Sequence, residues 1–163
     1  MNWEAAGVIA EVVGAIAVVL TLVYLAVQVR YARNETVDQN RLTRSTAVRE
    51  VILATIVDDD FRSGQMRHWG LEEYYETLAK ELGITSVEAS RNEWGDQYYF
   101  WMYWGQWTAT NDPDDLLELK HIIQTLFALP GMRHTWDSSP LGKVLLDEQF
   151  VEFVDEVLDE EMK

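Results

Sequence analysis

The sequence predicts an all-α protein in which one long N-terminal transmembrane helix continues into a small cytoplasmic helical bundle. Three observations support this fold class. Residues 5–29 form one apolar run, apolar residues recur at helical spacing after it, and no segment alternates between apolar and polar residues as a half-buried strand does. We divide the chain into a transmembrane anchor at residues 1–30, a helical stalk at 31–57 and an acidic cytoplasmic helical domain at 58–163.

The apolar run has the length and the flanking residues of a membrane-spanning helix. A helix needs about 20 apolar residues to cross the hydrocarbon core of a bilayer. Glu11 is the only charged residue in this run. Trp3 stands at one end of it and Tyr24 and Tyr31 at the other, where aromatic side chains favour the membrane interface. The sequence therefore predicts that this run crosses a lipid bilayer.

The charges beside the run predict its orientation. The N-terminal side carries only Glu4, whereas the other side carries a basic collar formed by Arg30, Arg33, Arg41 and Arg44. Because basic residues favour the cytoplasmic side, we expect the N-terminus outside and the C-terminal domain in the cytoplasm, at the bacterial inner membrane. A secretory signal peptide is the alternative, but residues 1–4 contain no basic residue and the apolar run is long for one.

One face of the predicted anchor collects its small and polar residues at spacings of three and four. Lipid tails give no reason for such a segregation, whereas close packing between helices does. We expect this small-residue stripe to mediate self-association or packing on another membrane protein, and an anchor that stays monomeric is the alternative. The stripe consists of Glu4, Gly7, Glu11, Gly14, Val18, Thr21, Leu25 and Gln28.

Glu11 admits a second interpretation of the stripe. About 20 residues separate it from Arg30, so we expect its carboxylate near the outer boundary of the hydrocarbon. A ring of such carboxylates in an oligomer could form the mouth of a cation pore. Val18 and Leu25 interrupt the polar character of the stripe and disfavour this alternative, an ion channel or transport component.

The stalk and the domain are predicted from helical spacing and from capping residues. Neither Gly nor Pro occurs between residues 15 and 63, so we expect one helix over residues 3–57, with a break near residue 34 as the alternative. Residues 58–60 are read as a solvated helix end and 61–70 as a connector. Further helices are expected at residues 71–82, from the capping box at 85–88 to about residue 108, and from residue 112 to before residue 130. A short turn of helix is expected at 132–136 and a last helix after residue 147. Residues 141–146 are expected to form a short helix or a buried connector.

The helix predicted at residues 86–108 is unusually rich in aromatic residues, which fall on every face. A helix that is apolar all round is buried, so we expect it at the centre of the domain. Because Trp and Tyr also carry a polar atom, the alternative is an aromatic wall that binds a ligand or a partner. That wall would consist of Trp94, Tyr98, Trp101, Trp104 and Trp107.

The charge and the chemical motifs narrow the function classes. The net charge of −15 disfavours nucleic acid as a partner, since phosphates would be repelled, while the basic collar suits anionic lipid headgroups. Glu118 and His121 have the spacing of a metal-binding pair, but neither of the other histidines has a Glu at that spacing, as a di-iron bundle requires. We therefore expect no metal, no cofactor and no enzyme activity.

Two segments resemble a known group of proteins. Residues 2–30 read NWEAAGVIAEVVGAIAVVLTLVYLAVQVR, and residues 129–139 and 146–158 read LPGMRHTWDSS and LDEQFVEFVDEVL. They resemble the corresponding parts of a large group of uncharacterised, membrane-anchored proteobacterial proteins. The resemblance implies a single-pass architecture and a membrane location, and it implies no activity. Together with the stripe, it predicts a self-associating inner-membrane protein with a structural, scaffold or regulatory role.

Overall fold

The computed structural model describes residues 3–110 and 112–160, apart from the side chains of residues 3–6, 9, 10 and 34. Every regular element in this part of the chain is a helix, and it contains no strand. The all-α prediction is therefore confirmed for the described residues. The contacts divide the chain into two compact units, residues 1–40 and residues 41–163.

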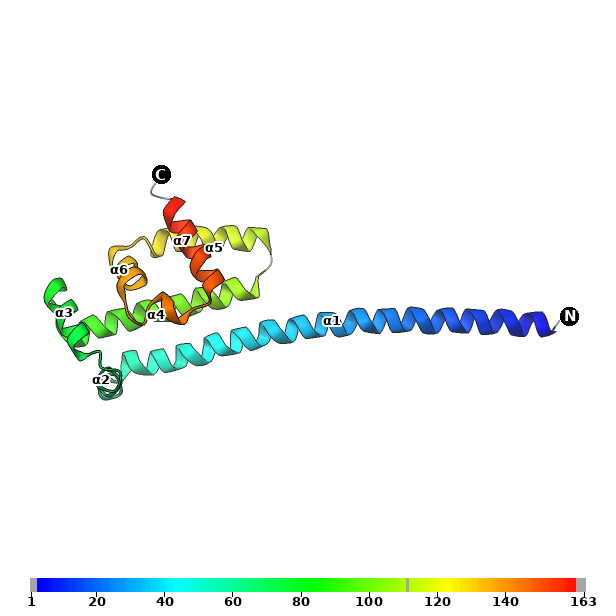
Figure 1. Ribbon diagram of the computed structural model, residues 1–163, viewed down its shortest axis with the longest axis horizontal. Helices are drawn as coiled ribbons and strands as arrows, with labels where there is room; N and C mark the ends of the chain where they lie inside the picture. Colours follow the sequence, from blue (N-terminus) through cyan, green and yellow to red (C-terminus); the bar gives the residue numbers. More distant parts are fainter. Residues whose placement is uncertain (1–2, 111, 161–163) are drawn as a thin grey trace. The chain divides into compact units, whose positions relative to one another are not determined.

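Helix α1 (Trp3–Val57) contributes to both units (Figure 1). Its extent agrees with the single helix predicted over residues 3–57, and the break considered near residue 34 does not occur. The absence of Gly and Pro between residues 15 and 63 explains this continuity, because no residue in that interval removes a backbone donor or favours a turn. Among the described residues of the first unit α1 is the only element, and side chains 11–33 are all exposed.

The second unit combines the end of α1 with six further α-helices and one short 3₁₀ turn. Helix α4 contacts α3, α5 and α6, and α5 contacts α7, so the predicted central position of the aromatic helix is confirmed (Figure 1). In chain order the elements are α2 (Asp59–His68), α3 (Glu72–Leu82), α4 (Ser86–Ala109), α5 (Pro113–Leu126), α6 (Pro130–Ser138), the 3₁₀ turn η1 (Lys143–Leu145) and α7 (Glu148–Glu160).

Helix α2 corrects two predictions. Residues 61–70 were expected to be a connector, yet most of them form this helix. The Asp58 side chain accepts a hydrogen bond from the Phe61 backbone nitrogen at 2.9 Å, so it caps the start of α2. The acidic residues 58–60, which were expected only to end α1, therefore also begin α2. Gly64 lies inside α2, where glycine lowers helix stability without preventing the helix.

The caps predicted from local sequence are confirmed. The Thr85 hydroxyl accepts from the Glu88 backbone nitrogen at 3.2 Å, and the Glu88 carboxylate accepts from the Thr85 backbone nitrogen at 2.9 Å. Asp112 caps α5 with Pro113 in its first turn. Gly83 ends α3 with a φ of 69°, in the left-handed region that glycine adopts without a steric penalty.

The segment at residues 141–146 was expected to be a short helix or a buried connector. It contains the 3₁₀ turn, and Val144 and Leu145 within that turn are 75% and 53% exposed. The 3₁₀ turn therefore lies at the surface of the second unit, whereas Leu141 and Leu146 on either side of it are half-buried and pack against the core.

Aromatic side chains from several helices form the main core of the second unit. The ring centroids of Phe100 and Phe127 lie 4.9 Å apart, and those of Phe100 and Trp136 lie 5.1 Å apart. These distances are typical of stabilising aromatic pairs. A smaller cluster packs α2 and α3 against the start of α4 and includes Met66, Tyr75 and Ala89. The aromatic helix thus supplies both clusters.

Residues 41–57 of α1 belong to this core. Ser45, Ile52 and Thr55 are at most 3% exposed. The Ser45 hydroxyl donates to the Trp101 carbonyl oxygen at 2.6 Å, and a Cβ placed on Gly105 would lie only 2.6 Å from that hydroxyl oxygen. The two helices therefore approach closely at this point because Gly105 has no side chain. The compact unit thus takes in the second half of the predicted stalk.

Arg62 joins α2 to the last turn of α1. Its side chain is fully buried, and one guanidinium nitrogen donates to the carbonyl oxygens of Thr55 and Ile56 at 3.2 Å each. A second nitrogen forms an ion pair with Asp59. Carbonyl groups in the last turn of a helix have no partner within the helix, so a buried arginine there satisfies them and fixes the corner between the two helices.

Candidate functional site

The small-residue stripe lies along α1 in the first unit. Nothing lies within 4 Å of a Cβ built on Gly7 or Gly14, and Glu11 is exposed. The Thr21 hydroxyl donates to the Ala17 carbonyl oxygen at 2.8 Å, within the same helix. The side chain of Glu4 lies outside the described residues. The glycine surfaces are thus open in the single chain.

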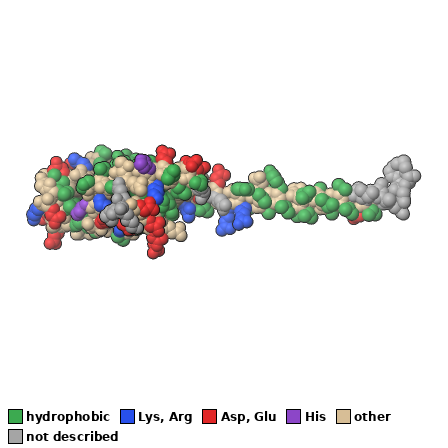
Figure 2. Space-filling model, turned by 90° about the horizontal axis from the view of Figure 1, so that it is seen from above, with side chains coloured by type: hydrophobic (Ala, Val, Ile, Leu, Met, Phe, Trp, Pro, Cys, Tyr) green, Lys and Arg blue, Asp and Glu red, His purple; other side chains and the backbone are tan. Residues whose placement is uncertain are grey.

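The apolar side chains of residues 11–33 are not covered by the described part of the chain. Val18, Leu20 and Leu25 are 59%, 64% and 49% exposed. Figure 2 shows mainly hydrophobic side chains along the first unit, and many Asp and Glu side chains on the second. Among the described residues, one helix is long and apolar enough to cross a membrane by length and composition, and it is α1.

The basic collar is divided between the two units. Arg30 and Arg33 are exposed in the first unit, whereas Arg41 and Arg44 are exposed in the second. The Arg44 guanidinium carbon lies 5.6 Å from the ring centroid of Trp101 and 5.5 Å from that of Trp104. Such cation–π contacts stabilise by about 0.5–1 kcal/mol at exposed sites. Arg44 therefore packs on the aromatic helix, a role that its sequence position did not indicate.

The five residues of the predicted aromatic wall do not share one surface. Trp94, Trp101 and Trp104 are buried, whereas Tyr98 and Trp107 are half-buried. Trp107 packs in the core against two phenylalanines of α7. Trp94 and Trp101, in contrast, line a groove on the surface of the second unit. Most of the predicted wall is thus core, and two of its buried members also line this groove.

This groove, which we call the apolar groove, has a volume of about 500 Å³. Pockets that bind small molecules have volumes of about 300–1,000 Å³ and mainly apolar linings with a few polar groups. Arg44 is the one charged residue in the lining. The uncharged polar groups of the lining are the Gln97 amide and the indoles of Trp69, Trp94 and Trp101. The other lining residues are aliphatic and come from α1 and from the segment around η1, including Ala47, Val48, Val51, Ile52, Leu141 and Leu145.

Two nitrogen donors in the groove residues lack an acceptor. Trp94 Nε1 and Gln97 Nε2 are buried and have no hydrogen-bond partner among the described residues. The two side chains are 7% and 2% exposed. A buried donor without an acceptor costs about 1–3 kcal/mol. Both nitrogens are inaccessible to solvent, so they add no exposed donor to the groove, and the Arg44 guanidinium is the charged group at its surface.

A second polar feature is the buried carboxylate of Glu93 in α4, which is 3% exposed. It accepts hydrogen bonds from the hydroxyl groups of Tyr74 at 2.8 Å, Tyr75 at 3.4 Å and Ser139. Burial raises the pKa of Glu93 above its usual value, and these hydrogen bonds oppose that rise in part. Glu93 thus ties α3 and the segment after α6 to the central helix.

Glu93 also borders a cavity of about 330 Å³ that is shared with Asp96, His134 and Thr135. The Thr135 hydroxyl donates to the Asp96 carboxylate at 2.6 Å, and burial raises the pKa of Asp96 as well. The sequence interpretation missed this cluster. A usable signal was present, because Glu93 is spaced four residues from Ala89 and from Gln97 and therefore falls on the buried side of the helix.

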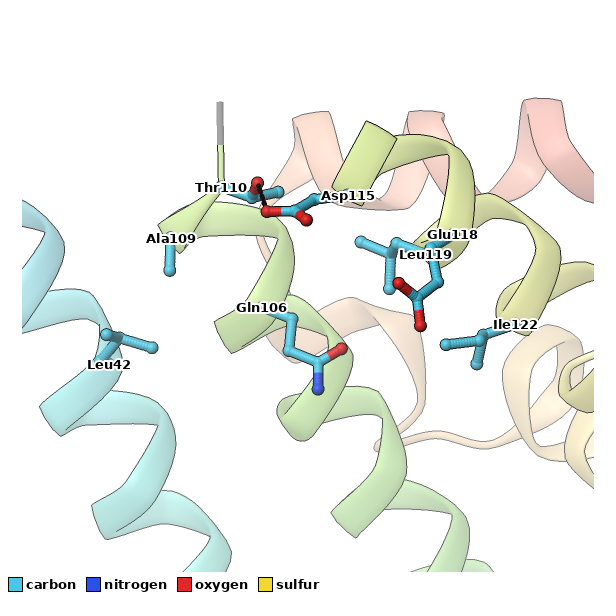
Figure 3. Close-up of a pocket in the computed structure, with 8 residues that line it drawn as sticks. All are labelled: Leu42, Gln106, Ala109, Thr110, Asp115, Glu118, Leu119 and Ile122. Carbon is cyan, nitrogen blue, oxygen red and sulfur yellow. Dashed lines mark hydrogen bonds between the residues drawn. The ribbon is translucent and has the colours of Figure 1, made fainter. Parts of the chain in front are cut away.

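Figure 3 shows another cavity, of about 440 Å³, between the residue 42 region of α1, the end of α4 and the start of α5. The Thr110 hydroxyl donates to the Asp115 carboxylate at 2.8 Å across its rim. Glu118, also in its lining, is exposed, as is His121 one turn further along α5. The polar groups of this cavity therefore face solvent or one another, and none of them is a buried group without a partner.

Metal binding and known relatives give no further assignment. Within residues 3–110 and 112–160, no group of three or more His, Asp or Glu side chains is placed to hold a metal ion. Neither a protein-family model, nor a curated protein, nor a solved structure matches the chain.

Proposed function

We propose that the protein is a single-pass inner-membrane protein that self-associates through its transmembrane helix and presents an acidic helical domain to the cytoplasm. Its role would be structural, scaffolding or regulatory. The observation that carries the proposal is the uncovered apolar surface of residues 11–33. Exposed apolar patches larger than a few hundred Å² are rare on soluble monomers and mark membrane or protein contacts.

The charge distribution supports the direction of insertion. Arg30 and Arg33 follow the apolar segment directly, and both side chains are exposed and able to reach lipid phosphates. The segment before Glu11 carries no basic residue. This asymmetry favours a cytoplasmic location for everything after the segment.

The stripe supports self-association in the membrane. Gly7 and Gly14 are two helical turns apart on one face, and the space above each is open. Small residues at such positions let two helix backbones approach closely, so that van der Waals contacts and weak polar contacts form along the interface. Glu11 lies between them at an exposed position. The other faces of the segment carry branched apolar side chains that suit lipid.

Crosslinking in native membranes, followed by mass measurement, tests the association. We expect a crosslinked species of two or more copies of the full chain. Gly14→Leu should weaken it about tenfold or more, because a leucine side chain would hold the helices apart. Val19→Leu, which enlarges a side chain off the stripe, is the matched control and should leave association unchanged. A monomer without any crosslinked product would contradict the proposal.

A further inference from the structure

The apolar groove leaves large hydrophobic side chains in solvent. Val51, Leu145 and Trp69 in its lining are 52%, 53% and 45% exposed. The Trp69 ring lies 5.5 Å from that of Trp94, so the exposed indole extends an aromatic surface that begins in the core. Covering such side chains is favourable by about 25 cal/mol per Å² of apolar area. The groove therefore favours an occupant with a substantial apolar part.

The groove lining carries hydrogen-bond donors in the Arg44 guanidinium, the three indoles and the Gln97 amide, and only the amide also has an acceptor oxygen. Trp94 Nε1 and Gln97 Nε2 have no acceptor, and the described residues form no ion pair with Arg44. Indole and guanidinium groups donate only, so each requires an acceptor oxygen. The lining contains no carboxylate, although the chain has 28 Asp and Glu residues. The Arg44 guanidinium, with no carboxylate beside it in the lining, therefore favours an occupant that carries negative charge.

We propose that the apolar groove binds a single-chain amphipathic carboxylate of the fatty-acid class. Its hydrocarbon chain lies against Val48, Val51 and Trp69, and its carboxylate lies at the Arg44 end. This site is a second binding function, independent of association through the stripe.

A protein helix fits the groove less well than a fatty acid does. The carbonyl oxygens of a helix are already used in its own hydrogen bonds, so an apolar helix face brings no anionic group to Arg44. A fatty acid brings two acceptor oxygens and no donor when ionised. The volume of about 500 Å³ also lies within the range of small-molecule pockets.

Photolabelling of the full chain in lipid nanodiscs tests the proposal. The probe is dodecanoate with a diazirine on its chain, and the labelled peptides are identified by mass spectrometry. We expect label on the peptides that contain Val51 and Trp69. Excess dodecanoate should compete, whereas dodecanol and dodecyltrimethylammonium, which lack the carboxylate, should compete at least tenfold more weakly.

Two pairs of variants provide controls. Ala47→Phe fills the groove and should abolish the label, whereas Ala54→Phe makes the same change at an exposed α1 position outside the groove and should keep it. Arg44→Gln should weaken competition by dodecanoate about tenfold, because a charge-assisted hydrogen bond is lost. Arg67→Gln removes an exposed arginine outside the groove and should have no effect. Circular dichroism confirms that each variant is folded.

Three outcomes would overturn the proposal. Label confined to residues 11–33 would mean that the probe only dissolves in the lipid around the helix. Equal competition by dodecanol would remove the carboxylate from the assignment. A photoreactive benzoylphenylalanine in place of Ala47 that crosslinks two copies of the chain would assign the groove to a second protomer instead.

Discussion

Two segments of helix α1 differ in which side chains they bury: one exposes its apolar side chains, and the other buries polar ones. In residues 11–33, apolar side chains such as Leu20 are 64% exposed. In residues 41–57, polar side chains such as Ser45 and Thr55 are at most 1% exposed. Both segments belong to one continuous helix. Within this chain, burial is therefore set by what packs against a segment and not by how apolar the segment is.

The physical reason lies in the packing partner of each segment. Residues 41–57 lie against the aromatic helix α4, where Ser45 is small enough to meet Gly105 and to satisfy its hydroxyl on the Trp101 carbonyl. Residues 11–33 have no partner among the described residues, so their apolar surface stays exposed in the single chain, and our proposal assigns it to lipid and to a second copy. The predictions below test this difference, from the largest effect on stability to the smallest.

The largest difference between the two regions is expected in the free energy of unfolding that is lost when a leucine is truncated to alanine. Leu119→Ala removes a side chain that is 3% exposed and should lower the free energy of unfolding of the second unit by about 2–5 kcal/mol. Leu20→Ala removes an exposed side chain of the first unit and should leave that free energy unchanged. Urea unfolding of the full chain in micelles, followed by near-ultraviolet circular dichroism, measures both. Equal losses would contradict the division of the chain.

Glycine substitutions in α4 test the close approach of residues 41–57. Gly105→Ala should destabilise by about 1–3 kcal/mol, because its Cβ would lie 2.6 Å from Ser45 Oγ and the neighbouring helix has to move. Gly95→Ala is the matched control in the same helix. Nothing lies within 4 Å of its Cβ, so the higher helix propensity of alanine should stabilise by about 0.5–1 kcal/mol. Changes of the same sign in the two thermal melts would refute this packing.

Removing the buried carboxylate of Glu93 should change how the stability of the second unit depends on pH. The pKa of Glu93 is raised above 4.5 in the folded protein, so between 4.5 and the raised pKa the unfolded chain loses its proton first. The contribution of Glu93 to stability is therefore present below pH 4.5 and is lost as pH rises through the folded pKa. Glu93→Gln lacks this loss, and its melting temperature relative to the natural chain should rise with pH.

Leu117→Ala serves as the comparison for that experiment, since Leu117 is 67% exposed and its replacement removes no titratable group. Its melting temperature relative to the natural chain should stay constant over the same pH range. A constant difference for Glu93→Gln as well would show that burial of this carboxylate has no energetic consequence.

The elements that the sequence predicted correctly depend on local signals. The extent of α1 follows from the lack of Gly and Pro, and the Thr85–Glu88 box and the Asp112 cap involve residues within a few positions of one another. Helix α2 was missed because Gly64 and the preceding acidic triplet resemble a connector. In fact Asp58 caps α2, while the buried Arg62 holds it against the end of α1.

The candidate sites were harder to predict because they depend on contacts between distant segments. The apolar groove joins residues near 44–52, 69, 94–101 and 141–145, which no spacing rule relates to one another. The hydrogen bonds of Glu93 to Tyr74 and Ser139 are likewise long-range. The stripe was visible in the sequence because all of its residues lie on one helix, whose period is known in advance.

The accessibility of single cysteines tests most directly whether residues 11–33 cross the membrane. The natural chain contains no cysteine, so Asn2→Cys and Ser138→Cys give two probes without background. In spheroplasts of a bacterial host, a membrane-impermeant maleimide should label Asn2→Cys directly and Ser138→Cys only after lysis. Equal labelling of both in intact spheroplasts, or release of the chain from the membrane by alkaline carbonate, would contradict a membrane-spanning helix.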